Sequence, residues 1–301
     1  MPCWRAVERE PGIDVNRSPE RRDAVTMSRT YPHGVPCWID TEPEDADAAR
    51  DFYGGLFGWT FEDAMAPEAS GSYLIGSLAG AVVAAIGRAG ADSVPGWNTY
   101  IAVDDADAVA AAVERAGGRS TSSPADAGPA GRSASFTDLA GARFRVWQPG
   151  RRGGVDVANA PGTWNFSDLH TSDPAGAISF YGGLFGWEAD DLGFATLIRR
   201  PGYGDHLEAT VDPDIRTRQA GVTPPGYEDA VAWLAPAAAG EAPHWHVTFA
   251  VADRDDAVAT ALALGAVDLS GPVDTEWTKV ATVREPQGAV FTLSQYAPAG
   301  A

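Results

Sequence analysis

Short hydrophobic runs and a helix-like segment follow one another in the N-terminal part of the chain. Residues 36–40 are typical of a strand, and the proline and acidic residues at 43–45 then indicate the start of a helix. We expect this helix to end near Leu56, because Gly58 can take the left-handed conformation that stops it. Further strands are predicted at 59–61, 72–75 and 81–86. The predicted order is βαβββ.

The same pattern recurs three more times along the chain. The predicted helices lie at 106–116, from about Pro174 and at about 255–264, and the predicted strands at 97–103, 134–137, 142–148, 164–168, 245–251, 280–283 and 289–295. Four βαβββ modules thus account for almost all of the chain. The pattern predicts an α+β protein.

An octapeptide repeat indicates that the chain is duplicated. Phe-Tyr-Gly-Gly-Leu-Phe-Gly-Trp occurs at 52–59 and again, without a change, at 180–187, which is an offset of 128 residues. Such recurrence is typical of two copies of one domain. The second and fourth modules also match each other, at an offset of 148 residues from Trp97 to Trp245. The repeat is therefore nested.

The octapeptide has a structural interpretation. Phe52, Leu56 and Trp59 share one side of the predicted helix end, which we expect to be buried. Gly54 and Gly55 would let the helix approach the sheet closely. We therefore interpret the motif as a packing element rather than a catalytic one.

The length of the chain indicates how many domains it forms. The 301 residues fit two domains of ordinary size, each long enough to bury its own core. We expect a disordered tail at 1–30, a first domain at 31–150, a linker at 151–162, and a second domain at 163–298 with an insertion at about 202–243. Two points stay open: whether Met1 or Met27 is the start, and whether module one pairs with module two or with module four.

Composition narrows the possible partners. The chain has 41 acidic and 22 basic residues and a formal net charge of −19, which would repel nucleic acid and anionic lipid. No apolar run approaches the roughly 20 residues of a membrane span. The two cysteines, Cys3 and Cys37, make no disulfide framework and fit a cytoplasmic protein. Neither nucleic acid nor a membrane is expected as a partner.

The paired modules, the octapeptide, and the turns at 138–141 and 285–288 before the closing strands together resemble the vicinal oxygen chelate superfamily. That superfamily includes glyoxalases, ring-cleaving dioxygenases and bleomycin-resistance proteins. Within it, the chain is most similar to two-domain actinobacterial glyoxalase-like proteins often labelled hydroxylases. The resemblance covers about 31–298 and implies two half-barrel domains, whose concave surfaces hold a divalent metal or an apolar ligand.

The resemblance also implies where metal ligands would lie. The metal-using members place His, Gln or Glu on the first strand of each module and Glu on the last strand. Those positions are occupied here by Trp38, Phe166, Asn98, His246, Arg145 and Thr292. In the first domain a ring, an amide and a guanidinium make no metal site. We expect no metal there and no cofactor in the protein.

Four of the five histidines lie in the second half, which keeps a divalent metal there as the alternative. His206 and Glu208 alternate onto one face of a strand predicted at 204–210, and His244 and His246 do so on another strand. Two histidines and a carboxylate suit non-haem iron or zinc.

Glu208 and His246 come nearest to the family's reactive positions, so they are the candidate catalytic pair. A general base is what a proton-abstracting enzyme of this fold would need. The alternative is a structural role, in which Glu208 pairs with an arginine such as Arg216 and His246 is a buried histidine without a metal.

Several tryptophans and the insertion bear on ligand binding. Flat aromatic walls suit a planar ligand, although ordinary core packing explains tryptophans equally well. Those expected on or beside the strands of the two concave surfaces are Trp38, Trp97, Trp147, Trp164 and Trp245. Within the insertion, a short amphipathic helix predicted at about 227–234 would be a lid or an interdomain brace.

Three functions from different classes follow. We favour a metal-independent protein, monomeric or homodimeric, that binds an aromatic or amphipathic small molecule through Trp38, Asn98, Arg145, Trp147, Phe166, His206, Glu208, His246 and Thr292. The second is a glyoxalase-like lyase or hydroxylase-like enzyme that acts through Glu208 and His246. The third is an interaction protein with vestigial sites.

Overall fold

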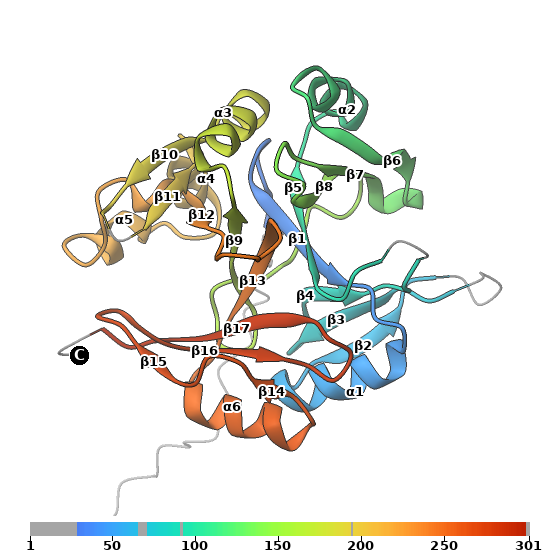
Figure 1. Cartoon of the computed structure of the whole chain (residues 1–301), viewed down its shortest axis with the longest axis vertical. Helices are drawn as coiled ribbons and strands as arrows, with labels where there is room; N and C mark the ends of the chain where they lie inside the picture. Colours follow the sequence, from blue (N-terminus) through green and yellow to red (C-terminus); the bar gives the residue numbers. More distant parts are fainter. Residues whose placement is uncertain (1–28, 66–70, 91–92, 194, 299–301) are drawn as a thin grey trace, which may run out of the picture.

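The computed structural model describes residues 29–65, 71–90, 93–193 and 195–298. It contains two mixed β-sheets with helices packed on the strands of each module (Figure 1). The predicted α+β class and the four βαβββ modules are confirmed. Apart from Arg29 and Thr30, the tail expected at 1–30 lies outside the described residues. No helix in these ranges is both long and apolar enough to cross a membrane.

The first sheet has the strand order β2-β3-β4-β1-β5-β8-β7-β6. Its strands are β1 (Pro36–Thr41), β2 (Thr60–Asp63), β3 (Leu74–Leu78), β4 (Ala81–Ile86), β5 (Trp97–Ala102), β6 (Arg119–Asp126), β7 (Gly131–Thr137) and β8 (Arg143–Pro149). Its helices are α1 (Ala46–Phe57), α2 (Ala106–Arg115) and the 3-10 turn η1 (Gly128–Ala130). The prediction missed β6, because this edge strand is polar and almost wholly exposed.

The second sheet repeats this order as β10-β11-β12-β9-β13-β17-β16-β14, with β15 also paired to β16. Its strands are β9 (Trp164–Thr171), β10 (Glu188–Asp191), β11 (Thr196–Arg199), β12 (Ala230–Pro236), β13 (His244–Ala250), β14 (Val267–Asp268), β15 (Val273–Asp274), β16 (Thr278–Arg284) and β17 (Val290–Tyr296). Its helices are α3 (Pro174–Phe185), α4 (Tyr203–Thr210), α5 (Ile215–Gln219), α6 (Arg254–Ala263) and the 3-10 turn η2 (Tyr227–Asp229).

Each module helix begins at an aspartate. The side chains of Asp45, Asp105, Asp173 and Asp253 accept hydrogen bonds from backbone N–H groups of the first helical turn. These groups have no partner inside the helix, so the aspartates fix where α1, α2, α3 and α6 start. The predicted helix starts near these residues are confirmed.

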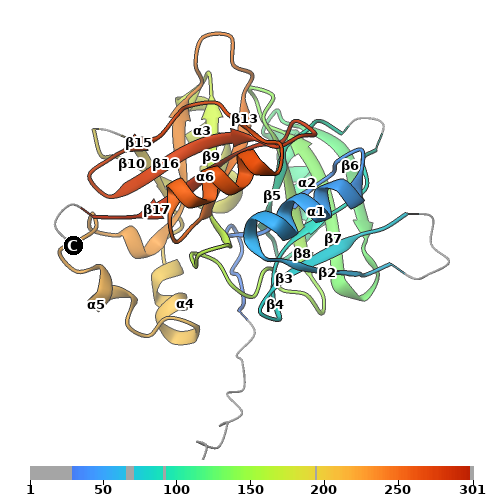
Figure 2. The ribbon, with the colours of Figure 1, turned by 90° about the horizontal axis from the view of Figure 1, so that it is seen from below.

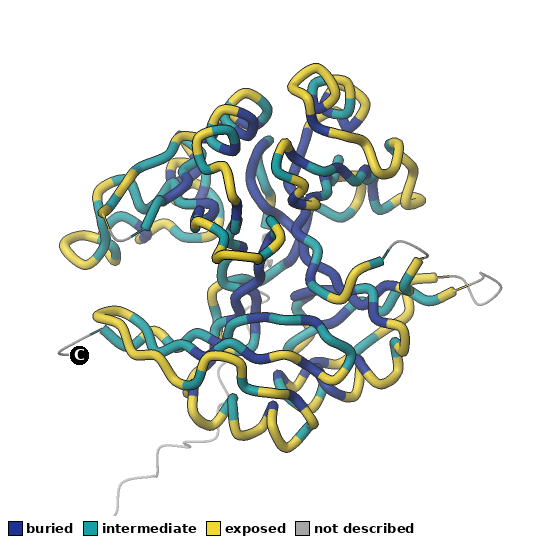
Figure 3. Tube along the Cα trace, viewed as in Figure 1, coloured by how far each residue is buried: buried dark blue, intermediate teal, exposed yellow. Residues whose placement is uncertain are grey.

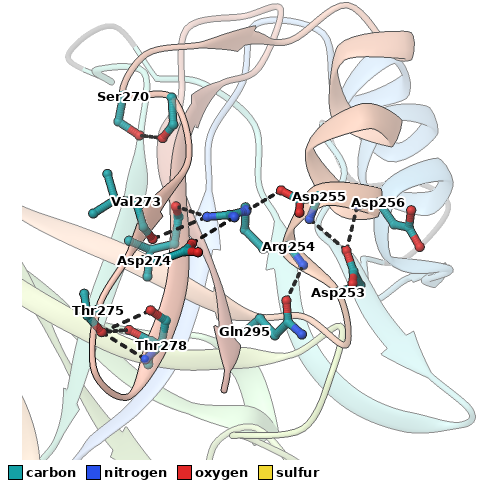
Figure 4. A network of polar contacts seen from close by, with 12 residues as sticks. Asp253, Arg254, Asp255, Asp256, Ser270, Val273, Asp274, Thr275, Thr278 and Gln295 are labelled. Carbon is teal, nitrogen blue, oxygen red and sulfur yellow. Dashed lines mark hydrogen bonds and ion pairs between the residues drawn. The ribbon is translucent and has the colours of Figure 1, made fainter. Parts of the chain in front are cut away.

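Arg254, at the start of α6, ties this helix to its sheet (Figure 4). Its side chain is 4% exposed and donates hydrogen bonds to the carbonyl oxygen of Val280 and to Asp274. Its backbone N–H donates to Gln295 on β17. Gln148 holds the start of α2 in the same way, by accepting from the backbone N–H of Ala106.

Backbone pairing and side-chain packing group the modules differently. In the first sheet, β1 pairs with β5 in antiparallel fashion and so joins modules one and two; β9 and β13 join modules three and four. The helices instead pair α1 with α6, which lie side by side in Figure 2, and α2 with α3. Figure 1 shows the two pairs at opposite ends of the molecule.

The two hydrophobic cores follow the helices. One core packs module one against module four, with the Phe57 and Phe249 rings 4.9 Å apart. The other packs module two against module three, with the Phe144 and Tyr181 rings 5.3 Å apart. Although each copy is long enough to bury a core of its own, both cores draw residues from the two copies. Figure 3 shows the buried residues running through the middle of the molecule, across both halves.

The octapeptide tryptophans link the two halves reciprocally. Trp59 Nε1 donates to the carbonyl oxygen of Gly162 (2.7 Å), and Trp187 Nε1 donates to that of Gly34 (2.6 Å). Both glycines have positive φ, and a Cβ on Gly34 would lie 2.6 Å from the carbonyl oxygen of Phe185. The octapeptide is therefore structural for a second reason, because the tryptophan of each copy forms a hydrogen bond to the backbone of the other copy.

The region between β11 and β12 departs from the prediction. Residues 227–234, expected as an amphipathic helix, form the turn η2 and then strand β12, the fourth strand of module three. Residues 204–210, expected as a strand, form α4 instead. The segment without a counterpart in module one is therefore 203–229, which is shorter than the expected insertion, because β12 belongs to the sheet.

Candidate functional site

One carboxylate in the first sheet gathers three hydrogen-bond donors. Asp40 on β1 accepts from Tyr100 Oη (2.6 Å), Asn98 Nδ2 (2.8 Å) and Tyr73 Oη (2.9 Å). Burial raises the pKa of Asp40, while the nearby Arg145 opposes that shift. This network brings the predicted Asn98 together with an aspartate that the prediction left out.

Arg145 closes the same network from β8. Its Nη1 donates to Tyr100 Oη (2.8 Å) and lies 2.7 Å from a Glu42 carboxylate oxygen. Trp38 Nε1 donates to Tyr73 Oη (3.0 Å), so this predicted ring residue is also engaged. The polar groups at the centre of the first sheet therefore satisfy one another. Their donors and acceptors leave little for a ligand or a metal.

Asp168 holds the position of Asp40 in the second sheet, and its surroundings differ. Its Oδ2 lies 3.4 Å from Thr248 Oγ1, and its Oδ1 is buried without a hydrogen-bond partner in the described part of the chain. The side chain as a whole is half-buried. Burial raises the pKa of Asp168 to about 7, opposed only by the Thr248 hydroxyl.

Three aromatic rings stand near Asp168. Phe166 lies 6.4 Å from both Tyr227 and Trp233, measured between ring centroids, and Tyr227 lies 6.2 Å from Trp233. Trp233 is also the direct β12 neighbour of Asp168. Burial, with a smaller effect of the Asp168 charge, raises the pKa of Tyr227 to about 12. The segment 203–229 thus supplies one ring, Tyr227, to this group.

His246 lies opposite Asp168 in the β9–β13 register. Its Nε2 is 2.8 Å from Thr292 Oγ1, so two of the predicted site residues are in contact. Burial, helped by the nearby His170 and His244, lowers the pKa of His246 to about 4. The imidazole is therefore neutral at pH 7.

A cluster with two histidines lies two residues along β9 and β13 from the Asp168–His246 pair. His170 on β9 and His244 on β13 are direct neighbours in the register, and Glu241 from the loop before β13 lies 3.0 Å from His170 Nδ1. Burial and then the proximity of His244 lower the pKa of His170. Within the described residues, this is the group of His, Cys, Asp and Glu side chains that is compact enough to hold a metal ion.

Two predicted site residues lie elsewhere. His206 and Glu208 are on α4, where a spacing of two residues does not put side chains on one helix face. His206 Nε2 contacts Thr30, and Glu208 pairs with Arg216, as the ion-pair interpretation expected. The expectation that His206 and Glu208 share a strand face is therefore wrong.

The predicted tryptophans lie in the hydrophobic cores or pack against them. Trp97, Trp164 and Trp245 are 4–6% exposed and pack in the two hydrophobic cores, so core packing explains them. Trp147 is half-buried, and its Nε1 donates to the carbonyl oxygen of Arg152.

Sequence reasoning missed several site residues, namely Asp168, His170, Tyr227, Trp233 and Glu241. For two of them a signal existed: the 128-residue offset maps Asp40 onto Asp168 and Glu42 onto His170. Tyr227 and Trp233 were missed because residues 227–234 were predicted as an amphipathic helix, whereas they form η2 and β12. Glu241 lies in a loop and carries no periodic signal.

Comparisons with known proteins agree with this fold. Residues 43–146 match the model of the glyoxalase/bleomycin resistance protein/dioxygenase superfamily, and residues 166–294 match the model of a glyoxalase-like domain. A protein of Mycobacterium tuberculosis named "Putative glyoxylase CFP32" is 34% identical, over 89% of this chain and 97% of its own length. The anthracycline biosynthesis protein DnrV of Streptomyces peucetius is 35% identical, over 89% of this chain and 94% of its own length.

Solved structures show the same fold at low identity. The Mn(II)-bound glyoxalase from Novosphingobium aromaticivorans superposes with a TM-score of 0.56 at 19% identity, over 87% of this chain and 82% of its own. The 2,3-dioxygenase LapB from Pseudomonas sp. KL28 gives 0.58 at 11% identity, over 90% and 97%. These likenesses concern the fold alone.

Proposed function

The chain belongs to the glyoxalase/bleomycin resistance protein/dioxygenase superfamily, and on that premise we propose that its second half binds a small molecule with an aromatic ring and a hydrogen-bond donor. The observation that carries the proposal is the buried Asp168 Oδ1, which has no hydrogen-bond partner within residues 29–65, 71–90, 93–193 and 195–298. Such an acceptor costs about 1 to 3 kcal/mol when it is left unpaired. A ligand hydroxyl or amine would recover that cost.

The rings around Asp168 define the rest of the ligand. Phe166, Tyr227 and Trp233 offer aromatic faces close to the carboxylate, and such faces favour a flat, apolar partner. The name of DnrV places that relative in anthracycline biosynthesis, which supports the same ligand class. The first half does not share this role, because Asp40 already has three donors.

Binding of this kind does not use the metal positions of the family. Phe166 and Thr292 have no side chain that ligates a metal well, and His246 is engaged with Thr292. The proposed binding is therefore independent of a metal at those positions.

A second candidate function is catalysis in the same half, of the lyase or hydroxylase type. Glu208 is occupied by Arg216, whereas Asp168 faces His246 across the β9–β13 pair. Asp168 thus replaces Glu208 as the candidate proton acceptor paired with His246. Turnover of a bound ligand, abolished by Asp168→Asn, would favour this function over binding alone.

A titration tests the binding proposal. Hydroxylated polycyclic aromatic compounds should quench tryptophan fluorescence and saturate at micromolar concentration, about −8 kcal/mol. Asp168→Asn should weaken binding by about 1 to 3 kcal/mol, because the carboxylate accepts more strongly than an amide.

Asp40→Asn is the matched control, since it makes the same change at the same position of the first sheet. Its binding should equal that of the wild type, provided that circular dichroism shows a native fold. Equal losses in both variants, or no saturation with any compound of this class, would contradict the proposal.

A further inference from the structure

Two histidines face each other across the centre of the second sheet. His170 on β9 and His244 on β13 are paired in the antiparallel register, and their ring centroids are 4.8 Å apart. Paired positions of neighbouring antiparallel strands project to the same side of a sheet. The two imidazoles are therefore held side by side by the backbone pairing of the central strands, not by a mobile surface segment.

A carboxylate completes the group. Glu241 Oε1 lies 3.0 Å from His170 Nδ1 and 3.7 Å from His244 Nδ1. The other oxygen, Oε2, accepts a hydrogen bond of 2.6 Å from the backbone N–H of Ala238. That bond orients the carboxylate and leaves Oε1 directed at the two rings.

His244 Nδ1 also has a backbone partner, so the ligand nitrogen of this ring would be Nε2. His244 Nδ1 lies 3.0 Å from the carbonyl oxygen of Ala242, to which it donates in one tautomer. A histidine that donates from one ring nitrogen to a backbone carbonyl presents the lone pair of the other nitrogen, and this is the usual outer contact of a metal-binding histidine.

We propose that His170, Glu241 and His244 bind a divalent first-row transition metal ion. One ligand atom from each residue lies within 4.8 Å of the other two. Ligands on bonds of about 2.1 Å are at most about 4.2 Å apart, so the three side chains need only draw in by roughly an ångström. Glu241 lies in the loop 237–243 between β12 and β13, so it can shift without breaking the hydrogen bonds of the sheet.

The donor set fits this class of ion. Two imidazoles and one carboxylate suit zinc, iron, cobalt, nickel or manganese, and they leave coordination positions for water or another ligand. The three side chains are 27%, 29% and 41% exposed, so solvent reaches them. The site uses none of the positions at Phe166, His246 and Thr292. It lies one same-face position beyond the Asp168–His246 pair on β9 and β13.

The competing explanation is that Glu241 only fastens its loop to β9 through an ion pair with His170. The two explanations differ in what His244 does. An ion pair needs Glu241 and His170 alone, whereas a metal site loses its affinity when either histidine is removed.

Metal titration of the untagged full-length protein tests the proposal. The protein is stripped with a chelator, and Zn²⁺ is then titrated by calorimetry, without any organic ligand. One ion should bind per chain. His170→Ala, Glu241→Ala and His244→Ala should each weaken binding by at least about 100-fold, because each removes one of three protein ligands. Co²⁺ should give visible absorption bands that His244→Ala abolishes.

His206→Ala is the control, because His206 lies on α4 and contacts Thr30. It should bind Zn²⁺ like the wild type. The proposal is overturned if Zn²⁺ does not bind the wild type above background, if His244→Ala binds it normally, or if His206→Ala loses as much affinity as His244→Ala. Since the probe is the metal alone, failure here leaves the small-molecule proposal standing, and the reverse also holds.

Discussion

Asp40 and Asp168 occupy one position in two copies of a module, and their partners differ. In the part of the chain that the structure describes, Asp40 has three short hydrogen bonds, whereas Asp168 has one long contact and an oxygen without a partner. The cause lies in single substitutions between the copies. Where Tyr100 reaches Asp40, the fourth module has the shorter Thr248. The Asp40 carboxylate is thus part of a hydrogen-bond network, while the described residues give Asp168 Oδ1 no hydrogen-bond donor.

A pair of conservative substitutions tests this difference. Tyr100→Phe should lower the free energy of unfolding by about 1 to 3 kcal/mol, because it removes the hydroxyl that joins Asp40 to Arg145. Thr248→Val, the matched change, should cost less than about 1 kcal/mol, since its contact with Asp168 is 3.4 Å long. Urea unfolding measures both. Equal losses would show that the two carboxylates are equally dependent on their neighbours.

Among the site residues, those that could be predicted lie at a fixed number of residues from a sequence motif. Asn98, Arg145, His246 and Thr292 were placed by counting along the chain, and the structure puts them at the sheet centres. Glu241 could not be placed in this way. Its partner His170 is 71 residues away, and their contact depends on how β12 and β13 bring the loop back to β9.

Helices α1 and α3 share the octapeptide but have different neighbours. A Cβ on Gly55 of α1 would lie 3.1 Å from the Leu264 side chain at the end of α6, while a Cβ on Gly183 of α3 would meet nothing within 4 Å. The glycine pair was expected to let each helix approach its sheet. At Gly55 the close neighbour is another helix end instead, and Gly183 has none within 4 Å, whereas a Cβ on Gly54 or Gly182 would lie 3.3 or 3.0 Å from the carbonyl oxygen of the tryptophan that follows its helix.

These glycines give a prediction at the scale of the element. Gly183→Ala should raise the free energy of unfolding by about 0.5 to 1 kcal/mol, because alanine is the better residue inside a helix. Gly55→Ala should gain less or nothing, since the new methyl group must displace Leu264. Thermal and urea unfolding of the two variants provide the measurement. A larger gain at Gly55 than at Gly183 would contradict this account.

The errors in element type also have a physical cause. Residues 230–236 are a continuous apolar run without alternation, and such a run cannot be distinguished by periodicity from a short helical segment. Pairing with β9 and β11 on either side decides their state as β12. By contrast, α1 and α3 were predicted well, because an aspartate starts each helix and a glycine ends it.

In the molecule as a whole, each hydrophobic core is made by both halves. The aromatic side chains of α1 pack on β13 and β17, and those of α3 pack on β8. Cutting the chain between the sheets would remove the Phe249 and Phe291 rings from α1 and the Phe144 ring from α3, and would so expose the apolar surfaces that these rings cover. Large exposed apolar surfaces destabilise a fragment and promote its association.

The isolated fragment 29–155 should therefore not fold as a stable monomer. We expect it to bind a hydrophobic dye, to lack the near-ultraviolet circular dichroism of packed aromatic rings, and to regain that signal when mixed with fragment 156–298. The intact chain should unfold in one transition, with coincident fluorescence and circular dichroism curves. A fragment that unfolds cooperatively by itself would contradict the shared cores.

The sequence by itself determined the number of modules, the limits of the main helices and the duplication, because these depend on local periodicity, capping residues and repeated motifs. The tertiary structure decided which modules share a core, that Asp168 Oδ1 has no hydrogen-bond partner among the described residues, and that His170, Glu241 and His244 meet. These features depend on contacts between residues far apart in the chain. A local pattern shows that a face is buried, but not which distant face covers it.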